Sequence, residues 1–139
     1  MKKQEILKLI QSYILLGPPV DEQIVIPASL LHKTLAAMIS DAFEDEWYVG
    51  KYPDVGQAVD SGIVGSALMH FVESGMYEKR LPFDLDLDTD AYIRNHPDVQ
   101  DGIKDGYFAS AQAHFEQVGL YEGRSFALAA PAPDEMTDD

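Results

Sequence analysis

The sequence predicts an all-α protein, in which an N-terminal helical pair is followed by two tandem three-helix repeats of period 44. Two observations predict this fold. Apolar residues in the first 43 positions recur at the three- and four-residue spacing of amphipathic helices. The segment over residues 45–80 then returns, altered but legible, over residues 89–124. Similarity at a fixed internal period is typical of helical units that bury their apolar faces by stacking.

The first 43 residues are expected to form two helices, one over about 2–16 and one from near Pro27 to about Phe43. "GPPVDE" separates them, because glycine can cap a helix and two prolines cannot continue one. Both helices carry more apolar surface than either can hide alone, so this region should cap the repeats or pair with a second copy. The expected interaction residues are Ile6, Leu9, Ile10, Tyr13, Leu31, Leu35 and Met38.

The repeat, which we place within a domain over residues 44–126, preserves thirteen of 36 paired positions. The identical pairs are Tyr48/Tyr92, Pro53/Pro97, Asp54/Asp98, Val55/Val99, Gly62/Gly106, Ser66/Ser110, Ala67/Ala111, His70/His114, Phe71/Phe115, Gly75/Gly119, Tyr77/Tyr121, Glu78/Glu122 and Arg80/Arg124.

These shared residues predict three short helices in each unit, at about 45–52, 53–61 and 64–74 in the first. Pro53 suits the first position of a helix, and Asp54 would complement the dipole in the first turn. Gly62 and Gly75 follow apolar runs and are expected in the left-handed conformation that ends a helix. The expected core of the first unit is Tyr48, Val55, Val59, Ala67, Phe71 and Tyr77.

The pattern "YxxxxPDVxxxVxxGxxxSAxxHFxxxGxYExR" resembles a short repeat of bacterial exported and surface proteins, also found beside polysaccharide glycosyltransferases, "YLxxNPDVxxAVxxGxxxSAxxHYxxxGxxEGR". The resemblance covers residues 45–126 and implies a helical accessory module without established catalytic residues. The first copy departs from it at Lys79, where the second has Gly123, and Trp47 faces Ala91 in the alignment. Residues 1–43 are not covered.

The composition excludes several classes of binding partner and site. A net charge of −14 repels phosphate backbones and anionic lipid, so we expect neither nucleic acid nor a membrane. The absence of cysteine removes thiolate metal sites and disulfides. Glu5 and Lys8 interrupt the apolar stretch that follows the basic start, which favours a helix of the mature protein over a signal peptide. We therefore expect a cytoplasmic location. Residues 127–139, Pro/Ala-rich and then acidic, are predicted to be a disordered tail.

Two polar sets recur with the repeat, and each has two interpretations. His70 and His114 could be ligands or bases, or half-buried rings bonded to a backbone group or carboxylate. We favour the second, since a catalytic group is seldom duplicated with its scaffold. Arg80 and Arg124, each beside a glutamate, could bind an anionic or sugar ligand. The preferred alternative is a latch in which they reach back to Asp54 and Asp98.

Two other patterns are weaker. "DLDLDTDAY" resembles the opening of a calcium loop, but Thr89 and Asn95 replace its required glycine and glutamate. We interpret it as a linker in which Asp88 or Thr89 caps the next helix. Ser66 and Ser110 lack a nucleophile elbow and are expected at close helix contacts.

The sequence therefore predicts a non-enzymatic interaction module, an adaptor or assembly subunit that forms homo-oligomers or binds another protein through apolar helical surfaces. No catalytic, metal or cofactor residue is expected. The alternative function is carbohydrate binding through Trp47, Tyr77, Arg80, Tyr121 and Arg124. A third, less favoured, is an enzyme that uses His70 or His114.

Overall fold

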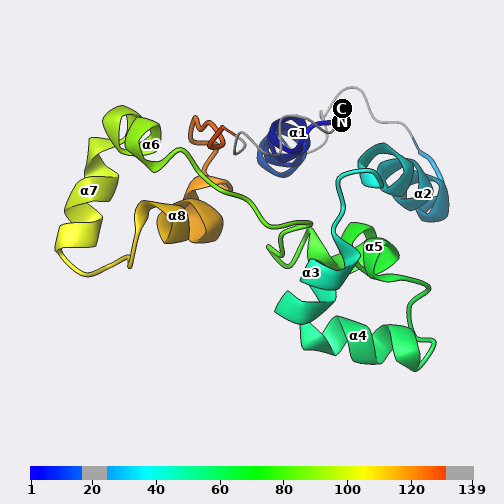
Figure 1. Cartoon of the computed structure of the whole chain (residues 1–139). Helices are drawn as coiled ribbons and strands as arrows, with labels where there is room; N and C mark the ends of the chain where they lie inside the picture. The colour runs from blue at the N-terminus through cyan, green and yellow to red at the C-terminus, as the bar shows by residue number, and fades with distance from the viewer. Residues whose placement is uncertain (17–24, 131–139) are drawn as a thin grey trace. The chain divides into compact units, whose positions relative to one another are not determined.

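A computed structural model of the chain describes residues 1–16 and 25–130, apart from the side chains of residues 13–16. The predicted all-α class is confirmed: within those residues the regular structure is helical, apart from one isolated β-bridge (Figure 1). The chain divides into two compact units, Met1–Asp84 and Leu85–Asp139. Unit 1 contains α1 (Lys3–Leu16), α2 (Ala28–Ile39), α3 (Asp45–Lys51), α4 (Pro53–Asp60), α5 (Ala67–His70) and the π-helix η1 (Phe71–Gly75).

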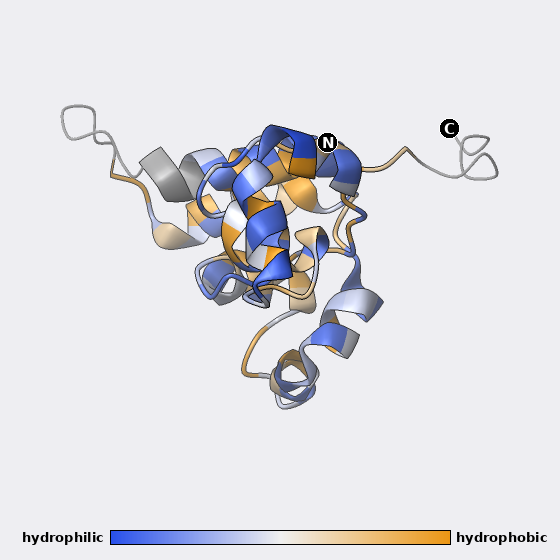
Figure 2. Cartoon of the chain, turned by 90° about the vertical axis from the view of Figure 1, so that its left-hand side faces the viewer, coloured by the Kyte–Doolittle hydropathy of each residue, from blue (hydrophilic) through white to orange (hydrophobic). Residues whose placement is uncertain are grey.

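Unit 2 contains α6 (Thr89–Asn95), α7 (Pro97–Lys104), α8 (Ala111–His114) and the π-helix η2 (Phe115–Gly119). Each of these four elements begins 44 residues after an element of unit 1, since α3, α4, α5 and η1 begin at residues 45, 53, 67 and 71. Hydrophobic and hydrophilic residues alternate along the short helices (Figure 2), so each helix buries only part of its surface.

The N-terminal helices differ from the prediction at one end and on one face. Helix α2 ends at Ile39, four residues before the expected Phe43. Its buried residues are Ala36 and Ile39, whereas Met38, one of the expected interaction residues, is 41% exposed. Periodicity alone could not orient this helix, because apolar residues occur on most of its circumference.

Helix α1 is held by both apolar and polar contacts within unit 1. Ile6, Leu7 and Ile10 are buried. At the amino end the Lys3 ammonium group donates to a carboxylate oxygen of Glu44 and to the carbonyl of Asp84, each at 2.8 Å.

The helix starts follow the sequence signals closely. Pro53 and Pro97 occupy the first positions of α4 and α7, as predicted. Asp88 caps α6 by accepting from the Ala91 amide, which confirms one of the two expected caps. Ser66 and Ser110 have a capping role that was not predicted. They are N-caps, and their hydroxyls accept from the amides of residues 69 and 113.

The predicted glycine conformations are right at one position and wrong at the other. Gly62 has a φ of +73° and ends α4, with the Ile63 amide donating to the Ala58 carbonyl in a Schellman motif. Gly75 is not left-handed and lies at the end of η1. A Cβ at Gly75 would overlap the Tyr48 hydroxyl, so close approach of a side chain explains this glycine.

The last helix of each unit is shorter than expected and changes character. Helix α5 begins at Ala67 and becomes the π-helix η1, in which the Met76 amide donates to the Phe71 carbonyl. The side chains of Tyr48, Val55, Ala67 and Phe71 are buried as predicted. The predicted core residue Tyr77 is instead 52% exposed.

The prediction of a disordered tail over residues 127–139 is wrong for its first residues. Leu128 forms the isolated antiparallel bridge with Leu87, and the Ala129 amide donates to the Asp86 carbonyl at 2.7 Å. Residues 127–130 are thus ordered against the linker before α6. The rest of the expected tail, 131–139, lies outside the described residues.

Candidate functional site

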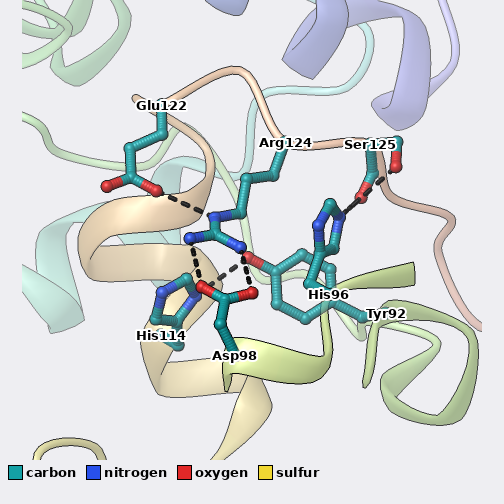
Figure 3. Close-up of polar contacts among 7 residues, drawn as sticks. All are labelled: Tyr92, His96, Asp98, His114, Glu122, Arg124 and Ser125. Atoms are coloured by element: carbon teal, nitrogen blue, oxygen red, sulfur yellow. Dashed lines mark hydrogen bonds and ion pairs between the residues drawn. The ribbon is translucent and has the colours of Figure 1, made fainter. Parts of the chain in front are cut away.

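A tyrosine–histidine pair lies in each unit. The Tyr48 hydroxyl and Nδ1 of His70 are hydrogen-bonded at 2.9 Å, and Tyr92 and His114 repeat the contact at the same distance (Figure 3). Helices α3 and α6 supply the tyrosines, and the last residues of α5 and α8 supply the histidines. The hydrogen-bonded histidine was predicted, but its partner is a tyrosine hydroxyl and not the expected backbone group or carboxylate.

Burial controls the protonation of the unit 2 pair. Burial, followed by the nearby Arg124 guanidinium, lowers the pKa of His114 below its ordinary value of 6.5. Burial raises the pKa of Tyr92 to about 12, and it also raises that of Tyr48. Both members of the Tyr92–His114 pair are therefore neutral near pH 7.

The predicted latch is confirmed as a contact in both units. The Arg80 guanidinium donates to both carboxylate oxygens of Asp54, at 2.9 and 2.8 Å. Arg124 and Asp98 repeat this bidentate geometry at 2.9 and 2.7 Å (Figure 3). The remaining guanidinium edge contacts Glu78 or Glu122 through Nε at 2.8 Å.

The latch alters the charge state of its carboxylates. The hydrogen bonds from Arg80 hold the pKa of Asp54 below its ordinary value, and those from Arg124 do the same for Asp98. Each latch joins the first turn of α4 or α7 to the segment that follows the π-helix, so it closes the unit.

A third contact at the same place was not predicted. In unit 2, Nε2 of His96 donates to the Ser125 carbonyl at 2.8 Å. Tyr52 occupies the corresponding position of unit 1, and its hydroxyl accepts from the Leu81 amide at 3.0 Å. Both side chains hold the segment that leaves the unit. Tyr52 and His96 both directly precede the proline that the two units share, Pro53 or Pro97. This common position could have predicted a common role, but the two residues are of different types.

Together these contacts satisfy the polar groups within the units. Within the described residues no buried side-chain nitrogen or oxygen lacks a hydrogen-bond partner. In unit 2 the neutral Tyr92–His114 pair lies beside the Asp98–Arg124 ion pair, in which the two charges offset each other. That combination suits cohesion between helices.

The acidic linker is arranged for capping. Asp88 is used as the α6 cap, while Asp84, Asp86 and Asp90 are exposed. In residues 1–16 and 25–130 no group of three histidine or carboxylate side chains is placed to hold a metal ion.

Most of the expected interaction residues face the interior of unit 1. Ile6 and Ile10 are buried, and Leu31 is half-buried. Leu9 and Leu35 line an apolar cavity of about 50 Å³, together with Ile6, Ile10, Ile39, Phe71, Val72 and Met76. The side chain of Tyr13 lies outside the described residues. Of the predicted set, Met38 alone among the described side chains is classed as exposed.

An exposed apolar surface nevertheless occurs on the other side of α2. Leu30 is 53% exposed, Met38 41%, and Ile26, just before the helix, 41%. We call these three residues the α2 stripe. They are spaced by multiples of four residues, which places Leu30 and Met38 on one helix face.

The residues of the carbohydrate alternative have varied environments. Trp47 is half-buried and packs edge-on against Tyr52, with ring centroids 6.3 Å apart. Tyr121 is also half-buried, whereas Tyr77 is exposed. Arg80 and Arg124 are engaged by the two latches.

No family model, curated protein or solved structure matches this chain. In the part of the chain that the structure describes, no helix has the length and apolar character needed to cross a membrane.

Proposed function

We propose that this protein is a non-enzymatic interaction module, whose repeat units form a rigid helical support and whose N-terminal region binds another protein chain. The resemblance of residues 45–126 to an accessory repeat supports this role. The observation that carries it is the α2 stripe, in which Ile26, Leu30 and Met38 remain exposed while Ala36 and Ile39 of the same region are buried.

The arrangement of polar groups also supports a scaffold. Histidine, tyrosine, arginine and aspartate recur in both units with the same contacts, and those contacts join segments of one unit. A group used for cohesion is expected to be copied with its unit, since every unit must be closed. A binding residue is needed only where the partner lies, and the stripe belongs to α2, which precedes the repeated segments.

The proposal is tested by capture of proteins from cells that make this chain. The wild type is compared with a Leu30→Ser/Met38→Ser variant and with Ile63→Ser. Ile63 is a matched control because it is apolar, 77% exposed and in the same unit. Proteins retained by the wild type and by Ile63→Ser should be lost from the double variant.

Equal capture by all three proteins would refute the proposal. Thermal unfolding of each variant serves as the control for fold, and all three midpoints should agree closely, because substitutions of exposed residues usually change stability little.

A further inference from the structure

The charge of this chain is distributed unevenly. Residues 1–43 contain four basic and four acidic residues, so their net charge is zero. Residues 44–139 contain six basic and twenty acidic residues and carry the whole net charge of −14. Two copies therefore repel each other through most of their surface, and contact between copies is least opposed at the N-terminal region.

Helix α2 lies within the longest stretch of that region without an acidic residue, between Glu22 and Asp41. Its exposed face presents Leu30 and Met38, with Thr34 midway between them. The Thr34 hydroxyl donates to the Leu30 carbonyl at 2.8 Å, so Thr34 adds no unpaired polar group to the face. These three residues carry no charge, and the two large apolar side chains are equally spaced from Thr34.

We propose that the α2 stripe binds the same stripe of a second copy, with the two α2 helices antiparallel and a two-fold axis at Thr34. The inference rests on the proposed function and names its partner. A two-fold contact must be self-complementary, and this register places Leu30 of each copy against Met38 of the other. The large apolar residues then face one another.

The register also suits the charges at the helix ends. Asp41 is exposed and follows α2 by two residues. In the antiparallel pair it lies at the amino end of the other α2, where the helix dipole favours a carboxylate. A parallel pair would instead bring the two Asp41 side chains together.

The size of the contact predicts its strength. Twelve residues of helix extend about 18 Å, and a pair of such faces buries less than the roughly 1,000 Å² of a stable interface. We therefore expect reversible self-association with a Kd between about 10 µM and 1 mM.

Cysteine cross-linking of the full chain tests the axis, because the chain contains no cysteine. Thr34→Cys places one thiol per copy at the axis, within reach of its symmetry mate. In a glutathione buffer this variant should form a disulfide-linked dimer at least tenfold more readily than Ile63→Cys, whose position is 77% exposed. Equal or slower cross-linking of Thr34→Cys would overturn the inference.

A charge-pair rescue tests the register by sedimentation velocity. Leu30→Lys and Met38→Glu should each abolish the concentration-dependent rise in mass, and the Leu30→Lys/Met38→Glu variant should restore it. Failure of this rescue while the wild type associates would overturn the antiparallel pairing.

Failure of the inference is distinguishable from failure of the proposed function. A wild type that stays monomeric up to about 1 mM would overturn self-association. If captured proteins were still lost from Leu30→Ser/Met38→Ser, the stripe would bind a different protein. If the stripe of that monomer were instead protected from solvent, its partner would be another segment of the same chain.

Discussion

The tyrosine–histidine pairs of the two units have the same geometry but different surroundings. Both hydroxyls lie 2.9 Å from Nδ1, yet His114 is 4% exposed whereas His70 is only half-buried. Position 108 accounts for part of the difference. Phe108 packs edge-to-face against the His114 ring with centroids 4.6 Å apart, and the corresponding residue of unit 1 is the smaller Val64. Identical residues thus reproduce the contact, while their neighbours determine how strongly it is shielded from water.

The largest predicted effect tests whether both units depend on close approach at the π-helix. Gly75→Ala and Gly119→Ala each add a Cβ that would overlap a buried tyrosine hydroxyl, of Tyr48 or Tyr92. Because these rings have no exposed surface, each variant should lose about 3 kcal/mol of unfolding free energy. Chemical denaturation measures the loss.

Gly50→Ala is the matched control, because a Cβ there meets nothing within 4 Å. It should raise the unfolding free energy by about 0.5–1 kcal/mol, since alanine favours a helix more than glycine does. A Gly119→Ala variant as stable as the wild type would show that the Tyr92 hydroxyl lies elsewhere.

The second prediction exploits the unequal burial of the pairs. Tyr92→Phe leaves Nδ1 of the buried His114 without its partner, and should cost about 2 kcal/mol of unfolding free energy. Tyr48→Phe should cost about 1 kcal/mol, because the half-exposed His70 can bond to water instead. Denaturation of both variants in one buffer provides the comparison, which equal losses would contradict.

The third prediction concerns a residue that the two units do not share. Lys79 has a φ of +61° and Gly123 a φ of +73°, so both adopt the left-handed conformation. Lysine pays a steric cost there that glycine avoids. Lys79→Gly should therefore raise the midpoint of thermal unfolding, with a gain of about 1 kcal/mol.

The reciprocal Gly123→Lys variant should lose about the same free energy. If Lys79→Gly instead lowered the stability of unit 1, the lysine side chain would be contributing more than its backbone costs.

The smallest predicted effect comes from the latch. Arg124 is 22% exposed and Asp98 64%, so solvent screens their interaction, and Arg124→Ala should cost about 1 kcal/mol or less. A double-mutant cycle with Asp98→Ala measures the coupling, and Arg80 with Asp54 gives the unit 1 comparison.

The coupling should depend on pH in a defined direction. Because Arg124 holds the pKa of Asp98 below its ordinary 3.8, the stabilisation is present above that value and is lost as the pH falls through the lower folded pKa. A coupling unchanged between neutral pH and strong acid would exclude the charged bond as its source.

Backbone signals carried most of what could be predicted from the sequence. These signals are proline and aspartate at the start of α4 and α7, and the left-handed Gly62. Each acts within one turn of helix, so it can be recognised from the sequence without knowledge of the tertiary structure. The Asp54–Arg80 pairing was also accessible, because both residues recur together in the second unit as Asp98 and Arg124.

Other features depend on contacts between segments far apart in the chain. Tyr48 meets His70 across 22 residues, and Gly75 is required only because that hydroxyl lies against it. Likewise, the buried side of α2 is chosen by what packs on it. Composition and periodicity determined the helices and their ends because those are local properties. Only tertiary packing decided which faces are buried, because the burial of a residue depends on the segments that pack against it.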